Sequence, residues 1–400
     1  MSVNQEFKGR HYETGSIANV LQASGWTDPT TGQPYSESLI FGASGGGAFG
    51  YFVFEYKGHL PHVALLPRNT FDPFNRALDN MAIIRESKET TQNNRAEDNL
   101  KKEIDLGNVP LVWADMFSMP HRGLDPKLMW IMMPYPVLAY EADRFLILDG
   151  AKVGVWIDAK DLDAARARVK KDRFRMMTLE APDETRLNDR LIEAAKSCTA
   201  LFLDKPPAGS ADNFGIRAMR HMAKLLVDEK SPKGWAKSFE PGPRLTNALV
   251  GTIAQPSVFA WIELWGTTDG ADRGTYADFL TQLSARTKNT ELTEIAKQFE
   301  MSRQLFTELA EASLPDQIAD CRRVKELRRE LRSQWFELGT GSIQRREELR
   351  AEHKQLVQTL GESKEFADAA PQIRQAMSQK LMEIADVEEP AVNQLRTALS

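Results

Sequence analysis

Short apolar runs alternate with amphipathic stretches in the first half of the chain, as is typical of an α/β arrangement. Ile17, Val20 and Leu21 fall on one helical face, which predicts a helix over residues 14–24 with Gly25 as its C-terminal glycine. Ser36 is predicted to cap a second, short helix. Further helices are predicted at 74–105 and 158–171, and strands at 51–56, 111–115, 137–140, 145–149 and 153–157.

Strand signals nearly vanish after residue 183, and apolar residues then repeat at steps of three and four. This spacing predicts long helices that pack along one stripe, either within the chain or as a dimer seam. The clearest stripe consists of Leu292, Ile295, Phe299, Ser302, Phe306 and Leu309, with further helices at 318–338, 342–360 and 370–386. The pattern therefore predicts an α+β protein, with an α/β domain at 1–181 followed by an all-α domain at 182–400.

Composition narrows the functional classes. A formal net charge of −5 argues against a broad nucleic-acid footprint, and no apolar run approaches the length of a membrane span. The first ten residues lack an apolar leader, so we expect a cytoplasmic protein with no nucleic-acid or membrane partner. Cys198 and Cys321 are expected to be buried packing residues, and the six histidines lack zinc-ligand spacing. No metal and no cofactor are expected.

The start of the first predicted helix is the most informative site. Thiol enzymes of the papain-like group place their nucleophile at such a helix start, where the helix dipole and free N–H groups favour a thiolate. Here the run His11, Tyr12, Glu13 leads into that helix, and Tyr12 occupies the nucleophile's place. A phenol with an ordinary pKa near ~10 does not replace a thiolate.

Several segments, in this order, resemble the family of butirosin biosynthesis protein H. In the N-terminal half they are His11 with the helix 15–21 and Gly25, the segment 36–42 with the glycine-rich segment 42–50 (the glycine loop), the segment 109–115, and the hairpin ending at Asp149. In the C-terminal half they are 232–235 with Phe239, and 270–280, which contains Arg273, Tyr276 and Asp278.

The resemblance implies a papain-like (cysteine-peptidase-like) N-terminal domain, a helical C-terminal domain, and acyl transfer from a carrier protein to an amine. A thiolate, a histidine and an orienting acid would share that chemistry. At the cysteine position this chain has Tyr12, and the expected histidine is replaced by the run 132–136, which includes Tyr135. Only Asp149 stands where the acid is expected, so thiol catalysis is not expected.

Other residues are candidate substitutes for the missing thiol and histidine. Ser16 with His11 would form a dyad, and Asp115 or Glu13 could deprotonate an amine held against a thioester. The loop histidines, His121 among them, are expected to lie on the surface. The glycine loop, with Gly42, Gly45, Gly46, Gly47 and Gly50, is expected to form a tight turn lining the cleft rather than a phosphate site.

Two functions from different classes remain open. The first is a binding or structural member of the family without thiol catalysis, which assembles through its helical half as a homo-oligomer. The second is a cysteine-independent acyltransferase that forms an amide. An acyl carrier protein or a small acyl ligand is the expected partner. The basic run Arg166, Arg168, Lys170, Lys171, Arg173 and Arg175 is predicted on a helix, as a solvated face or a docking site for an acidic helix.

Overall fold

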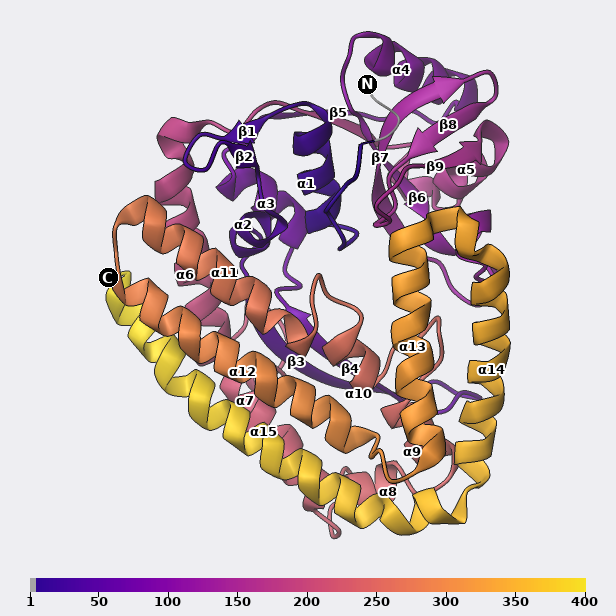
Figure 1. Ribbon diagram of the computed structural model, residues 1–400, viewed down its shortest axis with the longest axis vertical. Helices are drawn as coiled ribbons and strands as arrows, with labels where there is room; N and C mark the ends of the chain where they lie inside the picture. Colours follow the sequence, from indigo (N-terminus) through magenta and orange to yellow (C-terminus); the bar gives the residue numbers. More distant parts are fainter. Residues whose placement is uncertain (1–4) are drawn as a thin grey trace. The chain divides into compact units, whose positions relative to one another are not determined.

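The computed structural model describes residues 5–400 and contains two compact units, each assembled from segments that are separate in sequence (Figure 1). The first unit comprises the chain up to Ile40, Phe74–Arg190 and Ser333–Glu347; the second comprises Phe41–Pro73, Leu191–Arg332 and Glu348–Ser400. Residues 1–4, at the start of the first predicted domain, lie outside the described residues. The predicted boundary between residues 181 and 182 stays a prediction.

A six-stranded antiparallel sheet forms the centre of the first unit, in the order β5-β10-β6-β7-β8-β9. Its strands are β5 Arg85–Lys88, β6 Leu111–Asp115, β7 Met132–Glu141, β8 Arg144–Ile147, β9 Val155–Asp158 and β10 Met176–Leu179. Every residue of β6 is buried, as its continuous apolar run predicts for a strand covered on both faces. The predicted strands at 111–115, 145–149 and 153–157 are confirmed within about two residues, and the one predicted at 137–140 is confirmed but begins five residues earlier, at Met132.

Helices α1, α4 and α5 pack against this sheet. The helices of the unit are α1 Thr14–Ala23, α3 Pro73–Asn80, α4 Asn93–Asp105 and α5 Ala159–Ala167, with short 3-10 turns η1 Met116–Ser118, η2 Pro120–Arg122 and η3 Lys170–Asp172. A small pair, β1 Thr27–Asp28 with β2 Gln33–Pro34, precedes α2 Glu37–Ala43, whose amide at Leu39 binds the Ser36 hydroxyl at 3.1 Å. The predicted cap is therefore confirmed.

Two helix predictions in this unit are wrong, and strand β10 was not predicted. Residues 74–105 do not form one helix, because β5 interrupts them, and β10 lies where no strand was expected. The β5 residues are all polar and carry no strand pattern; their pairing with β10 in the sheet fixes them. The helix predicted over 158–171 ends at Ala167 and is followed by η3.

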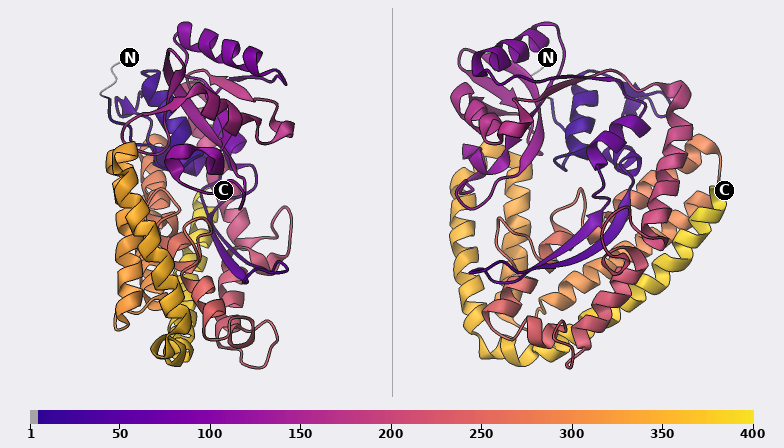
Figure 2. Two further views of the ribbon diagram at one scale, coloured as in Figure 1. Left: turned by 90° about the vertical axis from the view of Figure 1, so that its right-hand side faces the viewer. Right: turned by 180° about the vertical axis from the view of Figure 1, so that it is seen from behind.

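The second unit is mainly helical, and its sheet is the hairpin of β3 Gly47–Phe54 and β4 His62–Arg68. Helix α12 lies beside α11 and α15, and α7 lies beside α15, as the two views in Figure 2 agree. The helices wholly in this unit are α7 Gly215–Val227, α8 Trp235–Ser238, α9 Pro243–Leu249, α10 Val258–Glu263, α11 Arg273–Thr287, α12 Glu291–Ser313 and α15 Lys364–Ala398, with η4 Ala211–Asn213 and η5 Gly270–Asp272. Helices α6 Glu184–Leu203, α13 Ala319–Leu338 and α14 Ile343–Glu362 have residues in both units, and η6 Gly339–Ser342 belongs to the first.

The stripe predicted along 292–309 is buried at every position, which confirms the helical periodicity of α12. Helix α15 extends well beyond the predicted 370–386 and contains Pro390. A proline removes one backbone hydrogen bond, and here the helix continues because residues on both sides, such as Glu388 and Val392, are buried against its neighbours. In the part of the chain from residue 5 onward, no helix is both long and apolar enough to cross a membrane.

Candidate functional site

The start of α1 is occupied by a carboxylate from α2. Glu37 Oε1 accepts hydrogen bonds from the His11 amide at 3.1 Å and the Thr14 hydroxyl at 2.8 Å, and Oε2 accepts one from the Arg10 amide at 2.7 Å. An anion is favoured at a helix N-terminus, because the dipole and the free N–H groups there are positive. Glu37 therefore places a negative charge beside the start of α1. Glu37 is not among the residues predicted for the site.

Tyr12 is partly buried and packs against the core cluster of the first unit. Its ring centroid lies 4.0 Å from that of His11, whose Nδ1 accepts a hydrogen bond from the amide of the half-buried Glu13 at 3.3 Å. The Ser16 hydroxyl lies 2.6 Å from the Tyr12 carbonyl and 2.9 Å from the Pro134 carbonyl. These backbone contacts fix α1 on β7 and direct the hydroxyl proton away from His11.

Asp149, at the end of the β7–β8 hairpin, lies in a buried polar cluster. Arg122 binds both of its oxygens: Nε donates to Oδ2 at 2.7 Å, and a terminal nitrogen donates to Oδ1. His121 Nε2 lies 2.7 Å from the same Oδ2. Burial raises the pKa of Asp149, but the positive charge of Arg122 and the hydrogen bond from His121 outweigh it, and the pKa lies below the ordinary value.

His121 was expected on the surface, and that prediction is wrong: the residue is 7% exposed. It lies in η2, which ends at Gly123 with φ +59°, a left-handed conformation that glycine adopts without strain. The spacing of residues does not predict the pairing, because His121 lies 28 residues before Asp149 in the sequence and only the fold brings the imidazole to the carboxylate. The segment Pro120–Gly123, with Pro first and Gly last, is typical of a short helical turn, but it carries no signal for the burial of His121.

A segment from far along the chain completes this cluster within the first unit. The Trp335 indole stacks on His121 with centroids 5.5 Å apart and donates from Nε1 to the Asp149 carbonyl at 2.9 Å. Arg122 and Arg346 lie over the same indole at 5.0 and 4.6 Å, and Arg346 donates to the His121 carbonyl at 2.7 Å. One face of the imidazole is therefore covered by Trp335.

Tyr135 lies on β7 and is 2% exposed. Burial and the negative charge of Asp149 raise the pKa of its phenol well above the ordinary value, against the opposing effect of Arg122. The phenol is thus neutral at physiological pH. Tyr135 does not provide the base that a histidine at this strand would provide.

Asp115 holds a loop rather than facing a ligand. It is fully buried; Oδ1 accepts from the amides of Phe117 at 3.2 Å and Ile131 at 2.8 Å, and Oδ2 accepts from the Ser118 hydroxyl at 2.6 Å. Two of these bonds span η1, and the third closes the loop that follows η2. The oxygens of Asp115 are therefore engaged in holding the local backbone.

The basic run does not share one helical face, so that prediction is wrong. Arg166 is 1% exposed and donates to the Phe174 carbonyl at 3.2 Å, and Arg175 lies over the Trp113 ring at 3.8 Å. The other four members are exposed and lie at the end of α5 and in the turn after it. Only these four remain available to a partner.

The glycine loop lies in the second unit, where it forms the predicted tight turn. Gly45 and Gly46 have φ values of +98° and +64°. A Cβ added to Gly46 would lie 2.4 Å from the Tyr276 ring, and one added to Gly42 would lie 2.0 Å from the Phe279 ring. The glycines therefore allow a close approach of the backbone to α11. Gly47 and Gly50 begin β3, and a cleft-lining role for the loop stays a prediction.

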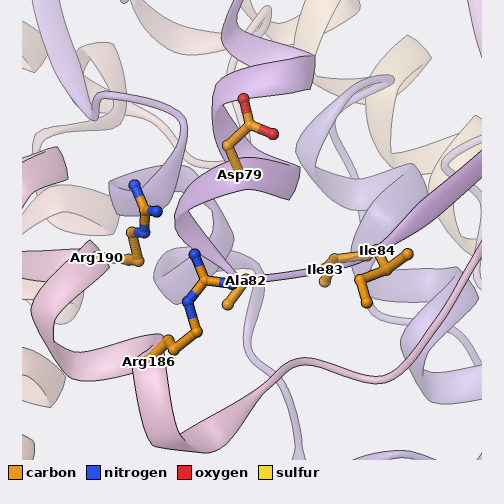
Figure 3. A pocket seen from close by; sticks show the side chains of 6 residues that line it. All are labelled: Asp79, Ala82, Ile83, Ile84, Arg186 and Arg190. Carbon is orange, nitrogen blue, oxygen red and sulfur yellow. The ribbon is translucent and has the colours of Figure 1, made fainter.

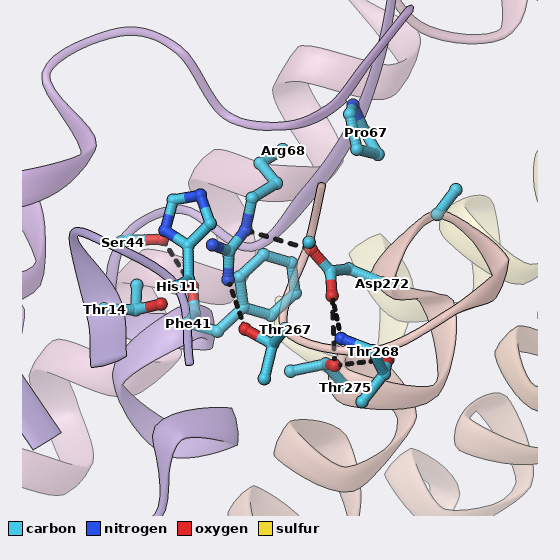
Figure 4. Close-up of polar contacts among 12 residues, drawn as sticks. His11, Thr14, Phe41, Ser44, Pro67, Arg68, Thr267, Thr268, Asp272 and Thr275 are labelled. Atoms are coloured by element: carbon cyan, nitrogen blue, oxygen red, sulfur yellow. Dashed lines mark hydrogen bonds and ion pairs between the residues drawn. The ribbon is translucent and has the colours of Figure 1, made fainter. Parts of the chain in front are cut away.

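The remaining C-terminal motif is buried in the same unit. Arg273 binds both oxygens of Glu388, at 2.6 and 3.2 Å, and donates to the Pro67 carbonyl at 3.1 Å, so it joins segments of both predicted domains. Asp278, by contrast, is exposed on α11. Figure 4 shows the neighbouring contacts of Asp272, which accepts from the Thr268 amide at 2.9 Å and pairs with Arg68 at 3.2 Å.

A surface cavity of about 240 Å³ lies elsewhere in the first unit, between α3 and the start of α6 (Figure 3). None of its lining residues belongs to the predicted site; they are Asp79, Ala82, Ile83, Ile84, Arg186 and Arg190. Among residues 5–400, no group of three or more His, Cys, Asp or Glu side chains is placed to hold a metal ion. Cys198 and Cys321 are both buried, as predicted.

Two sequence families match the chain. Residues 11–163 match the family described as butirosin biosynthesis protein H, N-terminal. Residues 160–335 match the family described as a domain of unknown function (DUF4872). No curated protein matches the chain. Tyr12, His121 and Asp149 fall within the first match, and Trp335 is the last residue of the second.

Proposed function

Because the chain belongs, through residues 11–163, to the family of butirosin biosynthesis protein H, we propose that it is a catalytically degenerate member of an acyl-transfer family that acts as a binding or structural protein. We further propose that the first unit is papain-like. The observation that carries the proposal is the binding of both Asp149 oxygens by Arg122. A carboxylate whose charge is compensated in this way is a weak partner for a catalytic imidazolium.

The residues at the other positions of a thiol site also favour binding over catalysis. Tyr12 stands at the nucleophile position, and Glu37 already occupies the helix N-terminus. The neutral phenol of Tyr135 adds no base. A ligand in such a site would be held by contacts rather than by a covalent bond. We propose a small acyl ligand or an acyl carrier protein as the partner, and assembly into a homo-oligomer through the helical second unit.

The test is incubation of the full chain with an acyl-N-acetylcysteamine thioester and an amine, followed by intact-protein and product mass spectrometry. We expect neither an acyl-protein adduct nor an amide. Native mass spectrometry of the same sample reports non-covalent binding of the acyl compound and the oligomeric state. Amide production at a rate well above the uncatalysed reaction would contradict the proposal.

The variant Tyr12→Cys tests whether a thiol at this position is sufficient for transfer activity. The variant restores a thiol but leaves Asp149 bound to Arg122, so we expect no gain of transfer activity. The matched variant Tyr12→Cys/Arg122→Gln removes the positive charge that competes with His121 for Asp149 and leaves the contact between His121 and Asp149. Robust turnover by Tyr12→Cys alone would show that the pairing with Arg122 does not limit the site.

A second candidate function rests on the buried contact of 2.7 Å between His121 and Asp149. This function is the formation of an amide from an amine and a thioester without a catalytic cysteine. With Nε2–H bonded to Asp149, His121 Nδ1 would take the proton from an amine as its nitrogen attacks the thioester carbonyl. The C–S bond then breaks, and the proton passes to the leaving thiolate. In the assay above, this function predicts amide that is lost in His121→Gln and kept in the control His59→Gln, whose histidine is exposed.

A further inference from the structure

An exposed apolar loop follows the His121–Arg122 turn in the first unit. Three large apolar side chains stand next to one another in it: Leu128 is 73% exposed, Met129 38% and Trp130 50%. Scattered exposed apolar residues are ordinary on a protein surface, but a contiguous group marks an interaction site. No function discussed above uses these residues.

The exposure is built into the loop. Arg168 donates to the Pro126 carbonyl at 2.8 Å, the Lys127 amide donates to Asp125 Oδ1 at 2.8 Å, and the Ile131 amide donates to the buried Asp115 at 2.8 Å. The loop is thus tied down on both sides of its apolar tip. The three apolar side chains are held outward by a fixed backbone.

Exposed cations lie at the end of α5 and in the turn after it. The Lys171 ammonium lies 5.9 Å from the centroid of the Trp130 ring, which places the turn after α5 beside the loop. We define the Trp130 patch as the apolar residues Leu128, Met129 and Trp130 with the exposed cations Lys127, Arg168, Lys170, Lys171 and Arg173. The neighbouring acids are Asp125, Asp172, the buried Asp115, whose Oδ2 lies 3.8 Å from Arg168 Nε, and Glu89, which lies 3.8 Å from Arg173. The patch is therefore net positive, although the whole chain carries −5.

We propose that the Trp130 patch binds the surface of an anionic lipid bilayer. Tryptophan is favoured at the membrane–water interface, leucine and methionine enter the headgroup boundary, and each lysine or arginine near an anionic surface adds attraction. Three of the five cations are lysines, which are depleted at protein–protein interfaces. The lack of a long apolar run excludes only a spanning helix; a surface contact by a loop needs none.

The experiment is flotation of the full chain with vesicles of equimolar phosphatidylcholine and phosphatidylglycerol, and with vesicles of phosphatidylcholine alone. The wild type binds the anionic vesicles and releases them as salt is raised, because screening weakens the charge attraction. Leu128→Ser/Trp130→Ser lowers the partition coefficient by about tenfold or more, since the buried apolar area is lost. Lys127→Glu/Lys171→Glu removes the preference for anionic vesicles.

Two matched controls retain binding. Leu106→Ser changes an apolar residue that is 66% exposed outside the patch, and Lys230→Glu/Lys233→Glu reverses two exposed charges in the second unit. Thermal unfolding shows whether each variant is folded. Absence of binding by the wild type overturns the proposal and favours an acidic protein as the partner of the patch. Equal binding to neutral vesicles, or equal losses in the control variants, overturns it as well.

Discussion

Replacement of Asp149 by asparagine removes the carboxylate that Arg122 and His121 bind. The Asp149 side chain is 3% exposed and that of Arg122 is 23% exposed, so the guanidinium would lose its counter-charge in a largely buried place. Removal of one partner of a buried ion pair costs about 3–5 kcal/mol. Because Arg122 keeps partial access to water and its contact with Trp335, we expect the lower end, about 3 kcal/mol, or a factor of about a hundred in the folding equilibrium.

Urea unfolding followed by tryptophan fluorescence measures this loss, and its pH dependence checks the cause. The pKa of Asp149 in the folded protein lies below its ordinary value of 3.8. Its ionised form therefore contributes stability that is fully present above that ordinary value and is lost as the pH falls through the folded pKa. The difference between wild type and Asp149→Asn is expected to be largest near neutral pH and to shrink in acid.

Asp79→Asn is the matched control, since Asp79 also pairs with an arginine, Arg85 at 2.6 Å, but its side chain is 59% exposed. An exposed pair contributes about 0–1 kcal/mol. In addition, Arg122→Met in the Asp149→Asn background removes the guanidinium charge that has lost its partner, and we expect it to restore part of the free energy of unfolding. If Asp149→Asn costs no more than Asp79→Asn, the reasoning about the buried pair is refuted.

Three further predictions concern the second unit. Gly46→Ala is expected to lower the midpoint of thermal unfolding clearly more than Gly25→Ala: both have positive φ, but an added Cβ meets the Tyr276 ring at 2.4 Å only at Gly46. Glu388→Gln leaves the wholly buried Arg273 without its counter-charge, at a cost of about 3–5 kcal/mol in chemical denaturation. Cys198 should not react with a thiol reagent at neutral pH until the protein unfolds, because burial raises its pKa to about 12; rapid labelling of the native chain would show that the side chain is accessible.

Local sequence was sufficient to predict the elements whose apolar residues follow a helical or strand pattern. Helix α1, its glycine stop and the stripe along α12 follow from apolar spacing, and strand β6 follows from a continuous apolar run. The glycine loop was also predictable, because Gly45 and Gly46 adopt conformations that suit glycine. The β5–β10 pair was missed, since the β5 residues are polar and become a strand only through the pairing.

The sequence by itself predicted the α+β class and the resemblance to the family of butirosin biosynthesis protein H, and it placed Tyr12 and Asp149 among the candidate site residues. It did not determine what that acid binds. His121 and Arg122 reach Asp149 from an isolated 3-10 turn, and Trp335 reaches it across 186 residues. Periodicity and capping report only on neighbours a few positions apart, whereas burial and charge pairing depend on which distant segments the folded chain brings together. Tertiary structure therefore decided that the acid is paired and covered.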